Sequence, residues 1–290
     1  MLLPELIPSW NRLREAFRPA PKPARANGCE CPSCLTEDRI LALFEIDPEQ
    51  MSVTEDVRCY VQNALGTIGT AEELAFLFPA LARLWAEKLE EADPDDSYGE
   101  HFWDALSRHE FLAVALPDEL RSAATEFLRT VLLSRIGREG PLKRIKGLAG
   151  THLWTEEVSR YAQTADDLKL LWKEWWAMPT AGHAVAAVQV ASCFAFKDEN
   201  NPIFHRWTPG GGGGPPVLKP AHGIHFVPWR ESNVKSLRRS LTAPFLESSI
   251  MRACRLLEDP AEKSLAEAVL EGVRGDPIGV ADRIHAFIDK

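Results

Sequence analysis

Three cysteines lie within six residues near the start of this 290-residue chain, at Cys29, Cys31 and Cys34. Thiolates are strong zinc ligands, and cysteines at this spacing can supply several ligands from one turn. A structural zinc site needs four ligands, so Cys59 or a distant histidine would have to complete it, because no second cysteine pair follows. Cys29, Cys31 and Cys34 are therefore candidate zinc ligands, and no other cofactor is indicated. The alternative is a reduced, metal-free turn whose cysteines pack under neighbouring helices.

Carboxylates are concentrated between Glu87 and Asp104, where eight of them accompany a single cation, Lys88. Such a patch could mimic phosphates and dock onto the basic active site of a partner protein. The alternative is a solvated helix end and loop, which is the usual meaning of a charge run. The predicted partner-binding residues are Glu90, Glu91, Asp93, Asp95 and Asp96.

A third group of residues is apolar and recurs every three to four positions: Leu168, Leu171, Trp172, Trp175 and Trp176. This spacing predicts one buried face of a helix, and core packing explains it without any partner. If the tryptophans were exposed instead, they would be anchors of a protein interface.

Histidines near a run of glycines are the only place where an enzyme site is expected. His205, His222 and His225 lie on either side of residues 210–214, which are all glycine. No Lys-Ser/Thr follows the glycines, so they do not form a phosphate loop, and the chain contains no Gly-x-Ser-x-Gly motif. An enzyme would need a site assembled from distant residues, with the glycine loop as a lid.

Composition excludes some classes of protein. The formal net charge of −9 argues against nucleic-acid binding, which needs a basic surface. The start of the chain lacks the basic and apolar regions of a signal peptide, and the most apolar run, residues 184–196, is too short to span a membrane. We expect a cytoplasmic protein with reduced thiols that binds neither nucleic acid nor membrane.

Helix signals dominate the chain. Leu6, Trp10, Leu13 and Phe17 form one apolar stripe at helical spacing. Capping boxes are predicted where Ser52 precedes Glu55 and where Thr70 precedes Glu73. Thr164 predicts an N-capped helix start, and Asp-Pro pairs at 259–260 and 276–277 predict two more. Further helices are predicted near residues 96–108, 118–136, 165–177 and 181–196, and the best strand is residues 223–229.

The predicted fold is therefore mainly α-helical, either one irregular bundle or two packed helical halves. Glycine and proline divide the chain into three parts. Residues 1–28 form an N-terminal helix and a Pro-rich arm, and residues 29–140 form a helical domain that contains the cysteine cluster. Residues 141–290 form a second helical half with a Gly-rich loop at 198–222.

The segments Cys31-Pro-Ser-Cys34, Tyr60-Val-Gln-Asn-Ala-Leu65 and Glu73-Leu-Ala-Phe-Leu-Phe-Pro79 resemble an uncharacterised group of bacterial proteins with an N-terminal Cys-Pro-x-Cys element. The resemblance covers roughly residues 28 to 135, and the stretch 246–270 is similar to the tail of the same group. It implies a helical fold and a bacterial origin. The group has no assigned activity, so the resemblance implies no catalytic residues.

The sequence as a whole favours a non-enzymatic protein that binds another protein. Within that class we expect an immunity protein that neutralises a bacterial toxin, with the acidic stretch covering a basic active site. Two alternatives stay open at this point. One is an enzyme with a site near the histidines of the Gly-rich loop, and the other is a structural or regulatory protein stabilised by zinc.

Overall fold

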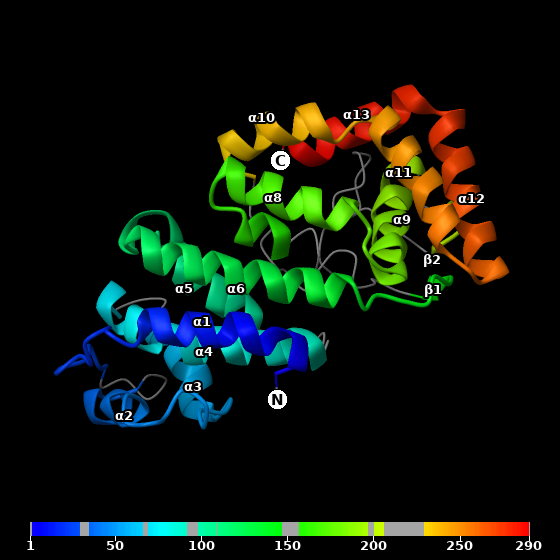
Figure 1. Ribbon diagram of the computed structural model, residues 1–290. Helices are drawn as coiled ribbons and strands as arrows, with labels where there is room; N and C mark the ends of the chain where they lie inside the picture. Colours follow the sequence, from blue (N-terminus) through cyan, green and yellow to red (C-terminus); the bar gives the residue numbers. More distant parts are fainter. Residues whose placement is uncertain are drawn as a thin grey trace. The chain divides into compact units, whose positions relative to one another are not determined.

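The computed structural model is built of helices packed against one another (Figure 1). It describes residues 2–29, 35–65, 69–91, 98–108, 110–146, 157–196, 200–205 and 229–289, with the backbone alone at 63–65, 91, 145–146 and 205. The mainly α-helical fold predicted from the sequence is confirmed. The described chain divides into two compact units, Met1–Val131 and Leu132–Lys290, and the division falls inside one long helix.

Unit 1 begins with a short helical turn and the first predicted helix, and it continues through four further helices and two π-helical turns. Its elements are η1 (Pro4–Leu6), α1 (Ile7–Phe17), α2 (Glu37–Leu43), α3 (Glu55–Cys59), η2 (Tyr60–Leu65), α4 (Ala71–Glu91), α5 (Tyr98–Arg108) and η3 (Phe111–Ala115). Helix α6 (Asp118–Ile136) runs across the division between the units.

The core of unit 1 is aromatic. Phe78 of α4 contacts Phe17 of α1, Phe102 of α5 and Phe111 of η3, with ring centroids 5.2 to 6.2 Å apart. The predicted stripe of α1 is fully buried, because Leu6, Trp10, Leu13 and Phe17 all face this core. Such ring pairs stabilise a core beyond the area that they bury.

The described residues of unit 2 form a short helical segment at 157–161, six longer helices and one pair of two-residue strands. Its elements are β1 (Ile145–Lys146), α8 (Ala165–Trp176), α9 (Ala181–Ala195), β2 (Phe204–His205), α10 (Glu231–Ser240), α11 (Ala243–Leu256), α12 (Pro260–Gly275) and α13 (Pro277–Ile288). The two strands are parallel, with Ile145 opposite Phe204.

Helix α9 is the centre of unit 2. It packs against α8, α11, α12 and α13, and nearly all of its side chains are buried. A helix that is apolar on every side must be surrounded in this way. Arg283 of α13 holds its C-terminal end, donating hydrogen bonds to the backbone carbonyls of Phe194 and Ala195. No helix of the described residues combines the length and apolarity that crossing a bilayer requires.

Most predicted helix starts are confirmed, and one is wrong. Thr164 accepts from the backbone N–H of Asp167 in a complete capping box, and Asp259 and Asp276 cap α12 and α13. The predicted box at Ser52 is wrong, because Thr54 caps α3 by accepting from the N–H of Val57 at 3.3 Å. The predicted strand lies outside the described residues except for Trp229, which is not in a strand.

Candidate functional site

Of the cysteine cluster, the structure describes Cys29 alone, and its side chain is half-buried. The backbone N–H of Cys29 donates a 2.9 Å hydrogen bond to the carbonyl of Leu35. This bond brings together the two ends of the segment that carries Cys31 and Cys34, which themselves lie outside the described residues. Among the residues that the structure describes, His, Cys, Asp and Glu form no group of three or more suited to a metal ion.

The Pro-rich arm before Cys29 is held by two carboxylates from the first turns of helices. Glu37 of α2 accepts from the backbone N–H of Ala26, and Glu73 of α4 accepts from that of Asn27, both at 3.3 Å. Gly28 lies so close to α2 that a Cβ there would be 2.1 Å from the backbone nitrogen of Glu37. The arm therefore enters the cysteine segment along a path that two helix N-termini define.

Glu73 is also the centre of a buried polar contact. Its second carboxylate oxygen accepts a 2.9 Å hydrogen bond from the hydroxyl of Tyr60, and both residues are buried. Burial raises the pKa of Tyr60 strongly, and the negative charge of Glu73 raises it further. The predicted box at Thr70 is therefore half right: Thr70 accepts from the N–H of Glu73, but the Glu73 side chain is directed to Tyr60 and the arm.

The acidic stretch is described only in part. Glu87 is mostly buried and forms an ion pair of 2.7 Å with Arg83. Glu90 and Glu100 are half-buried, and Asp104 of α5 is exposed. Of the five predicted partner-binding residues, the structure describes the side chain of Glu90; the side chain of Glu91 and residues 93, 95 and 96 lie outside the description.

The tryptophans of α8 belong to the core. Trp175 and Trp176 are buried, and Trp172 is half-buried with its ring 5.4 to 5.8 Å from theirs. Trp176 packs edge-to-face on Phe245 of α11. The prediction of a buried helix face is confirmed, and the alternative of exposed interface anchors is wrong. Within the part of the chain that the structure describes, the buried indole N–H groups of these tryptophans have no hydrogen-bond acceptor, and the crowding of the rings is compatible with N–H···π contacts.

The histidines of the predicted enzyme site lie outside the description, apart from the backbone of His205 in β2. A different histidine, His183 of α9, lies among described residues that form hydrogen bonds with it. Its Nδ1 lies 2.8 Å from the hydroxyl of Thr180, and that hydroxyl donates to the carbonyl of Gly137 at 2.9 Å. Burial lowers the pKa of His183, while a hydrogen bond to the carbonyl of Leu133 opposes this effect.

The thiols of Cys193 and Cys254 in unit 2 are not activated as nucleophiles. Cys193 donates to the carbonyl of Gln189, and burial raises its pKa to about 12. Burial also raises the pKa of Cys254, and the charge of Glu267 adds to the effect. Because the thiolate is the nucleophile, the raised pKa of each cysteine leaves less reactive thiolate near neutral pH than an ordinary cysteine has.

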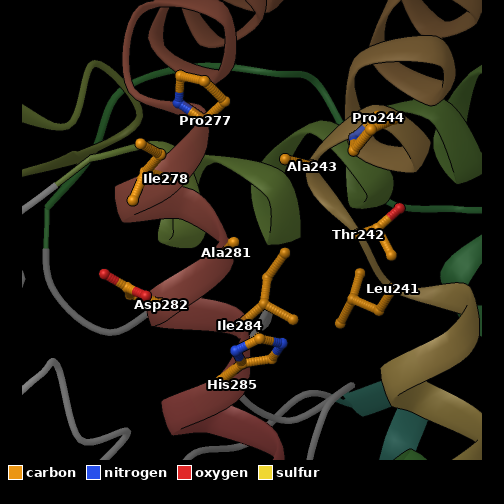
Figure 2. Close-up of a pocket in the computed structure, with 10 residues that line it drawn as sticks. All are labelled: Leu241, Thr242, Ala243, Pro244, Pro277, Ile278, Ala281, Asp282, Ile284 and His285. Carbon is orange, nitrogen blue, oxygen red and sulfur yellow. The ribbon is translucent and has the colours of Figure 1, made fainter.

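A groove of about 370 Å³ lies on unit 2, where α13 passes the beginning of α11. Figure 2 shows Ala281, Ile284 and His285 of α13 on one side and Leu241 and Ala243 on the other. Its walls are almost entirely apolar, and it is open to solvent. The sequence analysis did not predict this groove, because it lies between two helix starts, Thr242-Ala-Pro and Asp276-Pro-Ile, that are far apart in the sequence.

Comparison with known proteins does not narrow the function. No protein-family model matches the chain, and neither the curated proteins nor the solved structures contain a significant match. The resemblance to an uncharacterised bacterial group stays a prediction.

Proposed function

We propose that this chain is a non-enzymatic protein-binding protein, and specifically an immunity protein that neutralises a bacterial toxin by covering a basic active site. The observation that carries the proposal is the uneven distribution of charge. Unit 1 contains 24 Asp and Glu against 12 Lys and Arg, a formal net charge of −12, whereas unit 2 contains 18 against 21, a net charge of +3.

Because the net negative charge lies in unit 1, it affects how fast and with which partners the protein would associate. A negative field attracts a basic partner over a distance of about one Debye length, raises the rate of encounter and disfavours acidic competitors. Exposed carboxylates of unit 1 that can supply this field include Asp104 on α5, Glu110 beside η3 and Glu119 on α6. Asp104 is the last residue of the acidic stretch predicted from the sequence, and Glu110 and Glu119 follow it along the chain.

Three of the buried ionisable groups have structural tasks, which supports a binding protein rather than an enzyme. Glu73 holds Tyr60 and the N-terminal arm. Arg83 donates to the carbonyls of Pro48 and Met51, and Arg283 holds the end of α9. None of these groups borders the groove on unit 2.

The test is co-expression with the product of the adjacent gene. An immunity protein should co-purify with that product and restore growth to cells that express it. The variant Asp104→Asn, Glu110→Gln, Glu119→Gln should protect less well, because it removes three negative charges from the surface of unit 1.

A matched control removes three exposed carboxylates from unit 2: Glu258→Gln, Glu267→Gln, Glu271→Gln. This control should protect as well as the parent chain. Absence of both capture and protection would contradict the proposal, and equal losses in the two variants would show that the charge of unit 1 has no special part.

A zinc-stabilised structural protein is a second candidate. The hydrogen bond between Cys29 and Leu35 favours it, because a closed segment of this length can direct several thiolates to one point. Cys29, Cys31 and Cys34 would then be ligands, with a fourth ligand from elsewhere in the chain. Stoichiometric zinc in the purified protein would support this function, and metal-free protein with an unchanged melting temperature after chelation would contradict it.

A further inference from the structure

The groove on unit 2 has a protruding apolar side chain at its own edge. Ile278, in the first turn of α13, is 78% exposed, more than any other large apolar residue in the described chain. It is also one of the residues that line the groove. One face of unit 2 therefore carries both an apolar projection and an apolar hollow (Figure 2).

A projection and a hollow on one face are what a twofold-symmetric contact needs. In such a contact the same patch is used by both copies, so each feature must find its complement within the patch itself. The hollow, at about 370 Å³, is large enough to receive a branched apolar side chain.

An acidic and a basic side chain near the groove could also pair between two copies of the chain. Asp282 of α13 is exposed at the groove, and Arg239 is exposed in the last turn of α10, two residues before Leu241 of the groove wall. Neither side chain forms an ion pair within the described residues. Two copies placed face to face can therefore pair the acid of one with the base of the other, twice.

We propose that the chain self-associates through this face, with Ile278 of each copy seated in the groove of a second copy and Asp282 paired with Arg239 across the interface. The contact is a weak one. Stable interfaces bury about 800 Å² per partner over about 20–30 residues, whereas ten residues line the groove. The dimer should therefore form at concentrations on the order of 100 µM rather than nanomolar.

The experiment is sedimentation velocity of the full chain from 5 to 500 µM (about two decades around the expected midpoint). The parent should shift from monomer to dimer with rising concentration. Ile278→Asp should weaken the dimer by about tenfold or more, because it removes a buried apolar side chain and adds a charge. Aspartate in the first turn of a helix is favourable, so this variant should fold normally.

Further variants separate this face from others. Val114→Asp alters the most exposed large apolar residue among the described residues of unit 1, at 67% exposure, and should leave the dimer unchanged. Asp282→Lys and Arg239→Glu should each weaken the dimer, and the double variant should restore it.

A chain that stays monomeric at 500 µM (an upper limit on the order of the weakest specific contacts) would overturn the proposal, as would a dimer indifferent to Ile278→Asp or equally sensitive to Val114→Asp. Capture of a different protein by the groove of a monomeric chain would also overturn it.

Discussion

The hydroxyl of Tyr60 donates a 2.9 Å hydrogen bond to Glu73 Oε2, and the other oxygen of the same carboxylate accepts from the backbone of Asn27. One buried carboxylate thus joins η2, α4 and the N-terminal arm that leads to Cys29. A buried charge is tolerated when hydrogen bonds satisfy it, so the two donors are what allow Glu73 to lie in the core.

Replacing Tyr60 with phenylalanine should destabilise the protein by about 1–3 kcal/mol, because it leaves a buried carboxylate oxygen without its donor. Chemical denaturation measures the change. Tyr98→Phe is the matched control, because the hydroxyl of Tyr98 donates at 3.3 Å to a neutral carbonyl, that of Leu81, and should contribute only about 1 kcal/mol. A larger loss in Tyr98→Phe than in Tyr60→Phe would show that Glu73 does not depend on this bond.

His183 should make stability depend on pH. Its pKa is lower in the folded protein than the value of about 6.5 in the unfolded chain. Stability is therefore fully present above pH 6.5 or so and falls as the pH drops through 6.5 toward the folded pKa, because the unfolded chain takes up the proton more readily.

The variant His183→Asn tests this dependence. It should lose about 1 kcal/mol at neutral pH with the contact to Thr180, and its stability should fall less than that of the parent between about pH 6.5 and 5. His285→Asn, at an exposed position, should keep the parent's pH profile. If the stabilities of the parent and of His183→Asn change with pH in parallel, His183 is not the source of the pH dependence.

Neutralising the predicted partner-binding residues should weaken capture of a basic partner. In the variant Glu90→Gln, Glu91→Gln, Asp93→Asn, Asp95→Asn, Asp96→Asn, five charges leave a short segment, and affinity should fall about tenfold at low salt. Isothermal titration measures the affinity. If the parent and the variant bind equally well, this segment is a solvated helix end rather than a contact surface.

Zinc content tests the cysteine cluster. If the cluster binds zinc, Cys29→Ser should lower the bound zinc to well below one ion per chain and lower the melting temperature, because a structural site with a missing ligand binds weakly. Cys254→Ser is the control, since its thiol is buried in unit 2. Equal zinc content in both variants would exclude Cys29 as a ligand.

Local features of the fold could be predicted from the sequence, because neighbouring residues determine them. Helix α6 has the predicted bounds, and α9 ends one residue before the predicted end. The caps at Thr164, Asp259 and Asp276 depend on hydrogen bonds across two or three positions. The wrong cap at Ser52 is an error of two residues, in a segment where Ser52 and Thr54 are both suitable.

Long-range contacts could not be predicted, because no local pattern encodes them. In the sequence, Arg283 resembles an ordinary charged residue on the surface of a helix. In the structure it is buried against carbonyls 88 and 89 positions away. The groove combines residues 241–244 with residues 277–285, and the sequence gives no sign that these two helix starts are neighbours. Cys31, Cys34, residues 92–97 and the side chain of Glu91 lie outside the described residues, so the proposals that concern them depend on the sequence.

The most direct test of the central claim is the ionic-strength dependence of the association rate with the co-purified partner, measured by surface plasmon resonance. If the charge of unit 1 guides binding, the rate should fall at least about tenfold between 50 and 500 mM NaCl. The variant Asp104→Asn, Glu110→Gln, Glu119→Gln should start slower and fall less. An association rate that is independent of salt and unchanged in that variant would contradict the claim that this acidic unit binds a basic protein.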